Sequence, residues 1–219
     1  MRKITKAAAV VATFVIFTAG FSTIAQAAPT KPPSKVNCKK TIAKGHSVKN
    51  ITPPEVKAPF KNRTFTLKTN CGDIEIEADG VKAPVTVIAL AALANGGFYN
   101  QTICHRLTTN NIYVLQCGDP TATGSGGPNF SYRDENLPQA AEANYPAGIV
   151  AMANSGANTN GSQFFIVYED TSLPPSYTIW GKVTKGLDIV QSIANEGVVG
   201  GKNDGLPKRT IAIEKVKVR

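Results

Sequence analysis

The chain has 219 residues, of which 42% are hydrophobic, and its 24 basic and 15 acidic side chains give a net charge of +9. The basic residues are scattered or concentrate near the two ends, without interleaved aromatic side chains. We therefore interpret the charge as a solvated basic surface and expect no nucleic-acid partner.

The first 27 residues have the layout of a secretory signal peptide. A basic start is followed by an apolar, uncharged run over residues 7–19 and by the small-residue site Ala25-Gln26-Ala27. Cleavage after Ala27 would remove three basic residues and no acid, which lowers the net charge to +6. The alternative is a retained membrane anchor, because the apolar run with its tail approaches the roughly 20 residues that span a bilayer.

Residues 28–60 are rich in proline, lysine and threonine and have little apolar periodicity. This composition predicts an exported linker between the signal peptide and a folded domain. Residues 61–219 are numerous enough for one domain with a substantial core.

The four cysteines all lie in the part predicted to be exported, where disulfides form and persist. They permit three pairings. Because no Cys-x-x-Cys pair is present and the chain has only two histidines, we expect no metal site. The four cysteines are Cys38, Cys71, Cys104 and Cys117, and the two histidines are His46 and His105.

The first part of the domain reads as a hairpin followed by a helix. Apolar residues alternate with polar ones over residues 61–77, and the turn 70–73 contains glycine and aspartate. Residues 83–93 have helical apolar spacing, with Pro84 in the first turn and Gly96-Gly97 as the cap. The apolar face of this helix is expected to pack against a sheet.

Residues 104–120 read as two short strands joined by a polar turn. Folding back would place Arg106 and Gln116 beside Tyr113 and Val114, which predicts a recognition surface. The following residues 121–128 resemble a phosphate-binding loop only superficially, because the Gly-Lys-Ser/Thr ending is absent. We interpret them as a flexible surface loop.

Residues 148–167 contain strands at 149–153 and 164–167 that flank ten residues with small and amide side chains. Such a segment can bind an extended peptide, and the alternative is a polar surface loop. Residues 178–183 and 210–218 predict further strands, and residues 187–194 predict a second helix. Many short strands with two helices indicate a closed or nearly closed antiparallel sheet.

Three motifs together resemble the cyclophilin family of peptidyl-prolyl cis-trans isomerases, in particular its secreted or membrane-associated bacterial members. The resemblance implies a mainly β fold, a closed eight-stranded antiparallel barrel capped by two α-helices. It also implies isomerisation of X-Pro bonds, no cofactor, and proline-containing peptides as partners. Together with the predicted signal peptide, it leads us to expect exported proteins as substrates, and we expect a monomer. The motifs are Phe98-Tyr99 leading to His105-Arg106, Gln116-Cys-Gly-Asp119, and Met152-Ala-Asn through Asn158-Thr-Asn-Gly-Ser-Gln-Phe-Phe165.

The resemblance also implies roles for single residues. Arg106 would be the catalytic arginine, with Gln116 and Gln163 as its polar partners. Residues around the proline would be Tyr113, Val114, Phe165, Leu173 and Tyr177, and residues that hold the peptide backbone would be Ala153, Asn154 and Ser155. The competing hypothesis is a peptide-binding chaperone or interaction module that uses the same groove without significant turnover.

The sequence departs from the family pattern at four places. Asn110-Asn111 lengthens the turn after Arg106, so the alignment of Tyr113 depends on a two-residue insertion. Val114 and Tyr177 replace a common methionine and a common histidine. Leu173 falls about where many members have a tryptophan that contacts cyclosporin, so we expect at most weak binding of cyclosporin-type ligands.

Cys104 and His105 do not predict a nucleophile and its base, because neighbours in a strand point to opposite faces. We hypothesise a Cys104–Cys117 disulfide that staples the two strands carrying the site, which leaves Cys38 to pair with Cys71. In regular strands Arg106 shares a face with Cys104, whereas Gln116 lies opposite to Cys117. The Cys104–Cys117 pair and the Arg106–Gln116 pair can therefore both form across the two strands only if the strand pairing is irregular. We propose that this irregularity lies at the Asn110-Asn111 insertion.

Overall fold

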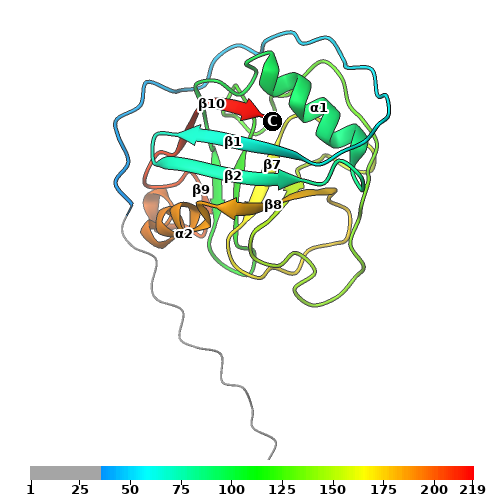
Figure 1. Cartoon of the computed structure of the whole chain (residues 1–219). Helices are drawn as coiled ribbons and strands as arrows, with labels where there is room; N and C mark the ends of the chain where they lie inside the picture. The colour runs from blue at the N-terminus through cyan, green and yellow to red at the C-terminus, as the bar shows by residue number, and fades with distance from the viewer. Residues whose placement is uncertain (1–35) are drawn as a thin grey trace, which may run out of the picture. The chain divides into compact units, whose positions relative to one another are not determined.

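A computed structural model describes residues 36–219, so the predicted signal peptide and the start of the predicted linker lie outside the described residues. One antiparallel sheet of ten strands curls into a barrel, in the order β3-β10-β1-β2-β8-β6-β7-β5-β4-β9 (Figure 1). The strands are β1 (Arg63–Thr69), β2 (Gly72–Ala78), β3 (Thr102–Ile103), β4 (Arg106–Thr108), β5 (Val114–Cys117), β6 (Ile149–Met152), β7 (Phe164–Val167), β8 (Ile179–Lys185), β9 (Asp204–Gly205) and β10 (Ala212–Val218). The helices are α1 (Pro84–Asn95), α2 (Leu187–Glu196) and the short 3-10 helix η1 (Val199–Gly201).

The expected class, a mainly β antiparallel barrel with two α-helices, is confirmed, and two details differ. The sheet has ten strands instead of eight, because β3 and β9 each add two residues at the ends of the strand order. Within residues 36–219 no ladder joins β3 to β9, so backbone pairing does not close the barrel. The chain turns away after two paired residues at each end, which leaves both edges short.

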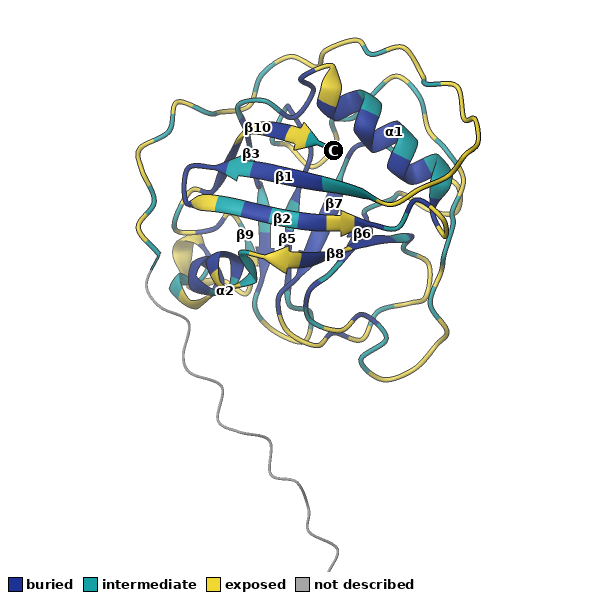
Figure 2. Ribbon diagram, viewed as in Figure 1, coloured by how far each residue is buried: buried dark blue, intermediate teal, exposed yellow. Residues whose placement is uncertain are grey.

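The core lies inside the barrel and follows from the alternation in β1 and β2. Phe65 pairs with Ile76 across the hairpin, and both side chains are buried. Trp180 from β8 meets Phe65 and Phe164 edge to face, with ring centroids 5.4 Å and 5.8 Å apart. Figure 2 shows that buried residues alternate with partly or fully exposed ones along the long strands β1, β2, β8 and β10. Burial of these rings dominates the core energetically because each removes a large apolar area from water.

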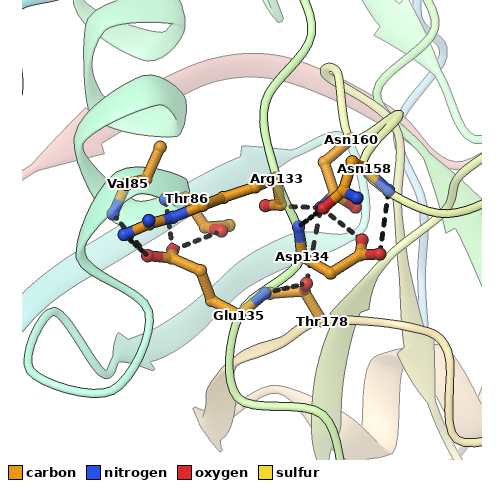
Figure 3. Close-up of polar contacts among 8 residues, drawn as sticks. All are labelled: Val85, Thr86, Arg133, Asp134, Glu135, Asn158, Asn160 and Thr178. Atoms are coloured by element: carbon orange, nitrogen blue, oxygen red, sulfur yellow. Dashed lines mark hydrogen bonds and ion pairs between the residues drawn. The ribbon is translucent and has the colours of Figure 1, made fainter.

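The helix α1 begins at Pro84 without a capping side chain of its own. Glu135, distant in sequence, accepts hydrogen bonds from the backbone N–H of Val85 and Thr86, at 3.2 Å and 2.9 Å, and from the Thr86 hydroxyl at 3.0 Å (Figure 3). A carboxylate there satisfies free helix donors and complements the helix dipole. At the other end, the predicted glycine pair ends the helix: Gly96 is the C-cap, and Gly97 after it has φ +71°.

Residues 36–60, the N-terminal strap, contain neither helix nor strand but lie on the barrel surface. A disulfide joins Cys38 to Cys71 in the β1–β2 turn. The backbone N–H of His46 donates to the carbonyl of Pro120 at 2.8 Å, and Ile51 packs against the main core. The strap therefore connects the first hairpin, the C-terminal end of α1 and the start of the glycine-rich loop. Among residues 36–219, neither α-helix combines the length and apolar character needed to cross a bilayer.

We predict that Glu135→Ala lowers the free energy of unfolding by about 1–3 kcal/mol, because it leaves buried helix donors without a partner. Urea denaturation measures the change. Glu142→Ala, which removes an exposed carboxylate, is the matched control. Equal stability of the two variants would contradict the capping role of Glu135.

Candidate active site

The β4–β5 hairpin carries the two residues expected to act in catalysis. Arg106 lies directly opposite Gln116 in the antiparallel ladder, and both side chains are half-buried on the outer face of the barrel. The intervening turn contains Asn111 with φ +62°. The hairpin thus places a guanidinium and a carboxamide side by side.

The proposed Cys104–Cys117 disulfide is present, and the geometric conflict with Arg106 and Gln116 is resolved at a different place from the one expected. Cys104 is outside β4, and its backbone N–H donates to Ile211 before the chain changes partner strand. The side-chain alternation therefore breaks at Cys104-His105, not at the Asn110-Asn111 insertion. Cys104 points into the core, whereas Arg106 faces outward.

Four polar side chains form a continuous line on this face, which we call the polar row: Asp204, Arg106, Gln116 and Gln163. The Nε2 of Gln163 donates to the carbonyls of Gly124 and Gly126, at 3.0 Å and 2.8 Å. Its oxygen must then face Gln116, whose Nε2 donates to it at 2.8 Å. The Gln116 oxygen is left to accept from Nη1 of Arg106 at 3.2 Å. The backbone of the glycine-rich loop thereby sets the orientation of both amides.

On its other side, the Arg106 guanidinium pairs with Asp204 through Nε and Nη2, at 2.8 Å and 2.7 Å. The hydrogen bonds that Arg106 donates to Asp204 raise the pKa of Arg106 despite partial burial, and the same bonds lower the pKa of Asp204. Arg106 is therefore a permanent cation whose charge does not titrate near neutral pH.

An apolar cluster lies beside the polar row and contains most residues expected around the proline. Phe165 meets Tyr177 edge to face with ring centroids 5.6 Å apart. The buried Tyr145 supports them, since its hydroxyl donates to the carbonyl of Tyr177 and accepts from its N–H, each at 3.0 Å. Burial raises the pKa of Tyr145 to about 12, so this hydroxyl stays neutral. The cluster comprises Ile112, Val114, Tyr145, Ile149, Ala151, Ala153, Phe165, Val167, Leu173, Tyr177 and Ile179.

Tyr113 is not brought into this cluster. Its ring packs toward the main core and meets Tyr168 edge to face, with ring centroids 6.0 Å apart. The preceding residue, Ile112, packs with Val114 and Phe165 instead. Ile112, and not Tyr113, is therefore the side chain of this turn that lies near the expected pocket.

The segment expected to hold the peptide backbone borders a cavity of about 260 Å³. Ala153, Asn154 and Ser155 line it, together with Gln116 and Gln163. The backbone of Ala153 is fixed by its N–H, which donates to Gln163 at 2.9 Å, and the Asn154 side chain donates to Ser176 at 2.8 Å.

Asp134 anchors the far end of this segment. Its carboxylate accepts from the N–H of Asn158 and from the amide of Asn160, both at 2.9 Å (Figure 3). The Asn158 side chain accepts in return from the Asp134 N–H at 3.0 Å. These reciprocal bonds tie the segment expected to hold the peptide to the loop that caps α1.

The glycine-rich loop lies at the surface, as predicted, and its backbone is arranged around Asp119. This fully buried carboxylate accepts from the N–H groups of Thr121, Thr123, Gly124 and Gly126. Burial raises the pKa of Asp119, but the hydrogen bonds from Thr121, Gly126 and Gly124 outweigh burial and hold the pKa below its usual range. Asp119 thereby fixes the backbone of the loop whose carbonyls accept from Gln163.

His105 has no hydrogen-bond partner for either ring nitrogen within residues 36–219. Burial lowers its pKa, and the charge of Asp119 opposes this only in part. The His105 ring thus makes no hydrogen bond to the polar row.

Sequence patterns alone did not predict roles for Ile112, Asp119, Tyr145 and Asp204. A signal was available for Asp119, because an aspartate before threonines and glycines is typical of a side chain that bonds its own turn. The other three depend on contacts between segments far apart in the chain, which local patterns do not contain.

Comparison with known proteins agrees with this geometry. Residues 64–218 match the family model described as "Cyclophilin type peptidyl-prolyl cis-trans isomerase/CLD". The barrel and the site define a prolyl isomerase, and the chain belongs to the cyclophilin family of peptidyl-prolyl cis-trans isomerases.

Curated relatives named "Probable peptidyl-prolyl cis-trans isomerase B" occur in two mycobacteria. The Mycobacterium leprae protein is 40% identical over 197 residues, which cover 84% of this chain and 67% of the relative. The Mycobacterium tuberculosis protein is 39% identical over 209 residues, covering 86% and 68%.

A crystal structure of a cyclophilin-type isomerase from Cryptosporidium parvum has 30% sequence identity to this chain and a TM-score of 0.61, and it covers 73% of this chain and 98% of its own. A second structure of that isomerase, obtained in the presence of the dipeptide Ala-Pro, has a TM-score of 0.60. The fold and the family are therefore the same by sequence and by structure.

We predict that Asp119→Asn destabilises the protein by about 1–3 kcal/mol at neutral pH, since an amide cannot accept all the loop hydrogen bonds. The folded-state pKa of Asp119 is lowered, so its stabilising contribution is complete above the unfolded value of about 3.9 and is lost as pH falls through the lowered value. Unfolding free energies of both proteins at several pH values should converge in acid. A difference independent of pH would contradict this account.

Proposed function

We propose that this isomerase accelerates X-Pro isomerisation in exported proteins and thereby assists their folding. One observation carries the proposal: Arg106, oriented by Gln116 and Asp204, lies next to an apolar cluster suited to a proline ring. Proline-containing segments of unfolded chains are the substrate class that combines an apolar ring with flanking backbone carbonyls.

The reaction requires no bond cleavage. Amide resonance creates a barrier of about 18–20 kcal/mol, and the uncatalysed change takes tens to hundreds of seconds. In the twisted state the prolyl nitrogen becomes pyramidal and can accept a hydrogen bond. A catalyst therefore acts by favouring the twisted amide over both planar forms.

Arg106 is suited to this task because its planar guanidinium donates in a fixed geometry and remains charged. We assign to it donation to the prolyl nitrogen and to the adjacent carbonyl. Gln116 orients the guanidinium, and Gln163 positions Gln116 through the polar row. The charge of the arginine acts more strongly beside the apolar cluster, where the effective dielectric is lower.

We assign the proline ring to the surface formed by Val114, Phe165, Leu173 and Tyr177, and we add Ile112 to it. We assign no ring contact to Tyr113, which turns toward Tyr168. Leu173 offers no indole for a cyclosporin-type ligand, which supports weak binding of such compounds.

The backbone of the substrate would lie along Ala153, Asn154 and Ser155. Within residues 36–219 the N–H and carbonyl of Asn154 have no protein hydrogen-bond partner. These free groups support pairing with an extended peptide, as in strand addition. Such anchoring confines the rotation to the proline.

The two disulfides support an oxidising, exported location, since disulfides are rare in reducing compartments. We propose residues 1–27 as the signal peptide, residues 28–60 as the connecting segment and residues 61–219 as a monomeric isomerase domain. The alternative for the first segment is a retained membrane anchor.

We predict that Arg106→Ala lowers kcat/KM for an X-Pro peptide by roughly 100-fold, the usual cost of removing a donor aimed at the transition state. Direct NMR exchange measures the rate without a coupled protease. Arg209→Ala, which removes another ion-paired arginine, should retain activity. A wild-type rate no better than Arg106→Ala, with client binding preserved in both, would favour a peptide-binding module without turnover.

We predict that the mature protein begins at Ala28 when it is isolated from its native cell envelope or medium. Intact-mass measurement distinguishes this from a chain that begins at Met1. Retention of Met1 in the membrane fraction would support the anchor and would contradict cleavage.

A further inference from the structure

Asp204 contacts the catalytic arginine from a strand 98 residues further along the chain. We propose that Asp204 is a positioning residue for the reaction, which fixes the plane of the Arg106 guanidinium relative to the substrate. The proposal rests on the assignment of Arg106 as the catalytic arginine.

The donor count shows what the pair contributes. The guanidinium has five N–H groups, and Asp204 accepts from one on Nε and one on Nη2, at 2.8 Å and 2.7 Å. Gln116 accepts a third from Nη1 at 3.2 Å. One donor on each Nη remains for the substrate. A single bond to Gln116 leaves the guanidinium free to rotate about that contact, whereas two parallel bonds to a carboxylate define its plane.

The backbone of Asp204 is itself held in place. Strand β9 pairs with β4, so that Asp204 lies opposite Thr108, two residues after Arg106. The N–H of Thr109 donates to Asn203 at 2.9 Å, and the N–H of Val199 donates to Leu206 at 2.9 Å. Gly205 has φ +146°, and a Cβ there would approach Val198 to 3.2 Å. The carboxylate is therefore attached to a fixed edge next to the arginine.

Stability does not explain this pair. The side chains of Arg106 and Asp204 are 43% and 55% exposed, and ion pairs at such exposure contribute little to folding. An exposed pair with two short, parallel bonds supplies orientation to a side chain that would otherwise sample many rotamers. Orientation has catalytic value because small displacements of a catalytic group reduce rates strongly.

The test uses Asp204→Asn and Asp204→Ala. Asparagine has a similar shape, but it accepts with one oxygen and turns amide hydrogens toward the guanidinium. We expect kcat/KM to fall by roughly 10- to 100-fold in both variants. The Kd of an X-Pro peptide, measured by NMR titration, should change less than about twofold. The reason is that the polar row orients the Arg106 guanidinium, whereas the apolar cluster binds the proline ring. Glu196→Gln removes an ion pair elsewhere in the C-terminal part and should leave both values unchanged.

The double variant Arg106→Ala/Asp204→Ala separates positioning from a structural role. If Asp204 acts through Arg106, the double variant should be no less active than Arg106→Ala alone, whereas a structural role predicts a further loss. An additive loss, or Asp204→Asn activity at or above wild type, would overturn the proposal. Full activity of Arg106→Ala would instead overturn the catalytic assignment, so the two failures are distinguishable.

Discussion

The functional face depends on hydrogen bonds that begin at one buried carboxylate. Asp119 arranges the N–H groups of the glycine-rich loop, and this leaves the carbonyls of Gly124 and Gly126 facing Gln163. An amide donates hydrogen bonds only from its nitrogen, so the loop carbonyls fix the orientation of the Gln163 amide. Gln163 in turn fixes the orientation of Gln116, whose oxygen then accepts from Arg106. Rigid backbone thus determines how a flexible side chain presents its donors.

The rest of the architecture supports this row from several sides. The Cys104–Cys117 disulfide joins the chain before β4 to the end of β5, on either side of Arg106 and Gln116. The N-terminal strap reaches the start of the glycine-rich loop at Pro120. These constraints involve parts of the molecule that contact no substrate in the proposed mechanism, and they lower the entropy that the site loses when it orders around a peptide.

In the proposed mechanism, the charged and the apolar parts of this site have separate tasks. The apolar cluster around Phe165 would bind the proline ring, while the polar row would donate hydrogen bonds to the twisted amide. Tyr145 stabilises the apolar cluster from within, since its hydroxyl fixes the backbone of Tyr177 next to Phe165. An arrangement of this kind binds both planar isomers similarly and can still favour the state between them.

The sequence by itself determined the hairpin, both helices, the antiparallel class and the family motifs, because these depend on periodicity and on neighbouring residues. It also located Arg106, Gln116 and Gln163 as members of one site. Tertiary structure decided that Ile112, not Tyr113, joins the apolar cluster, and that Asp204 holds Arg106. It also placed the break in strand alternation at Cys104-His105, where the chain leaves β10 and pairs with β5. Such features depend on contacts between segments that are far apart in the sequence. A local sequence pattern does not show which distant strand a residue will pair with or pack against.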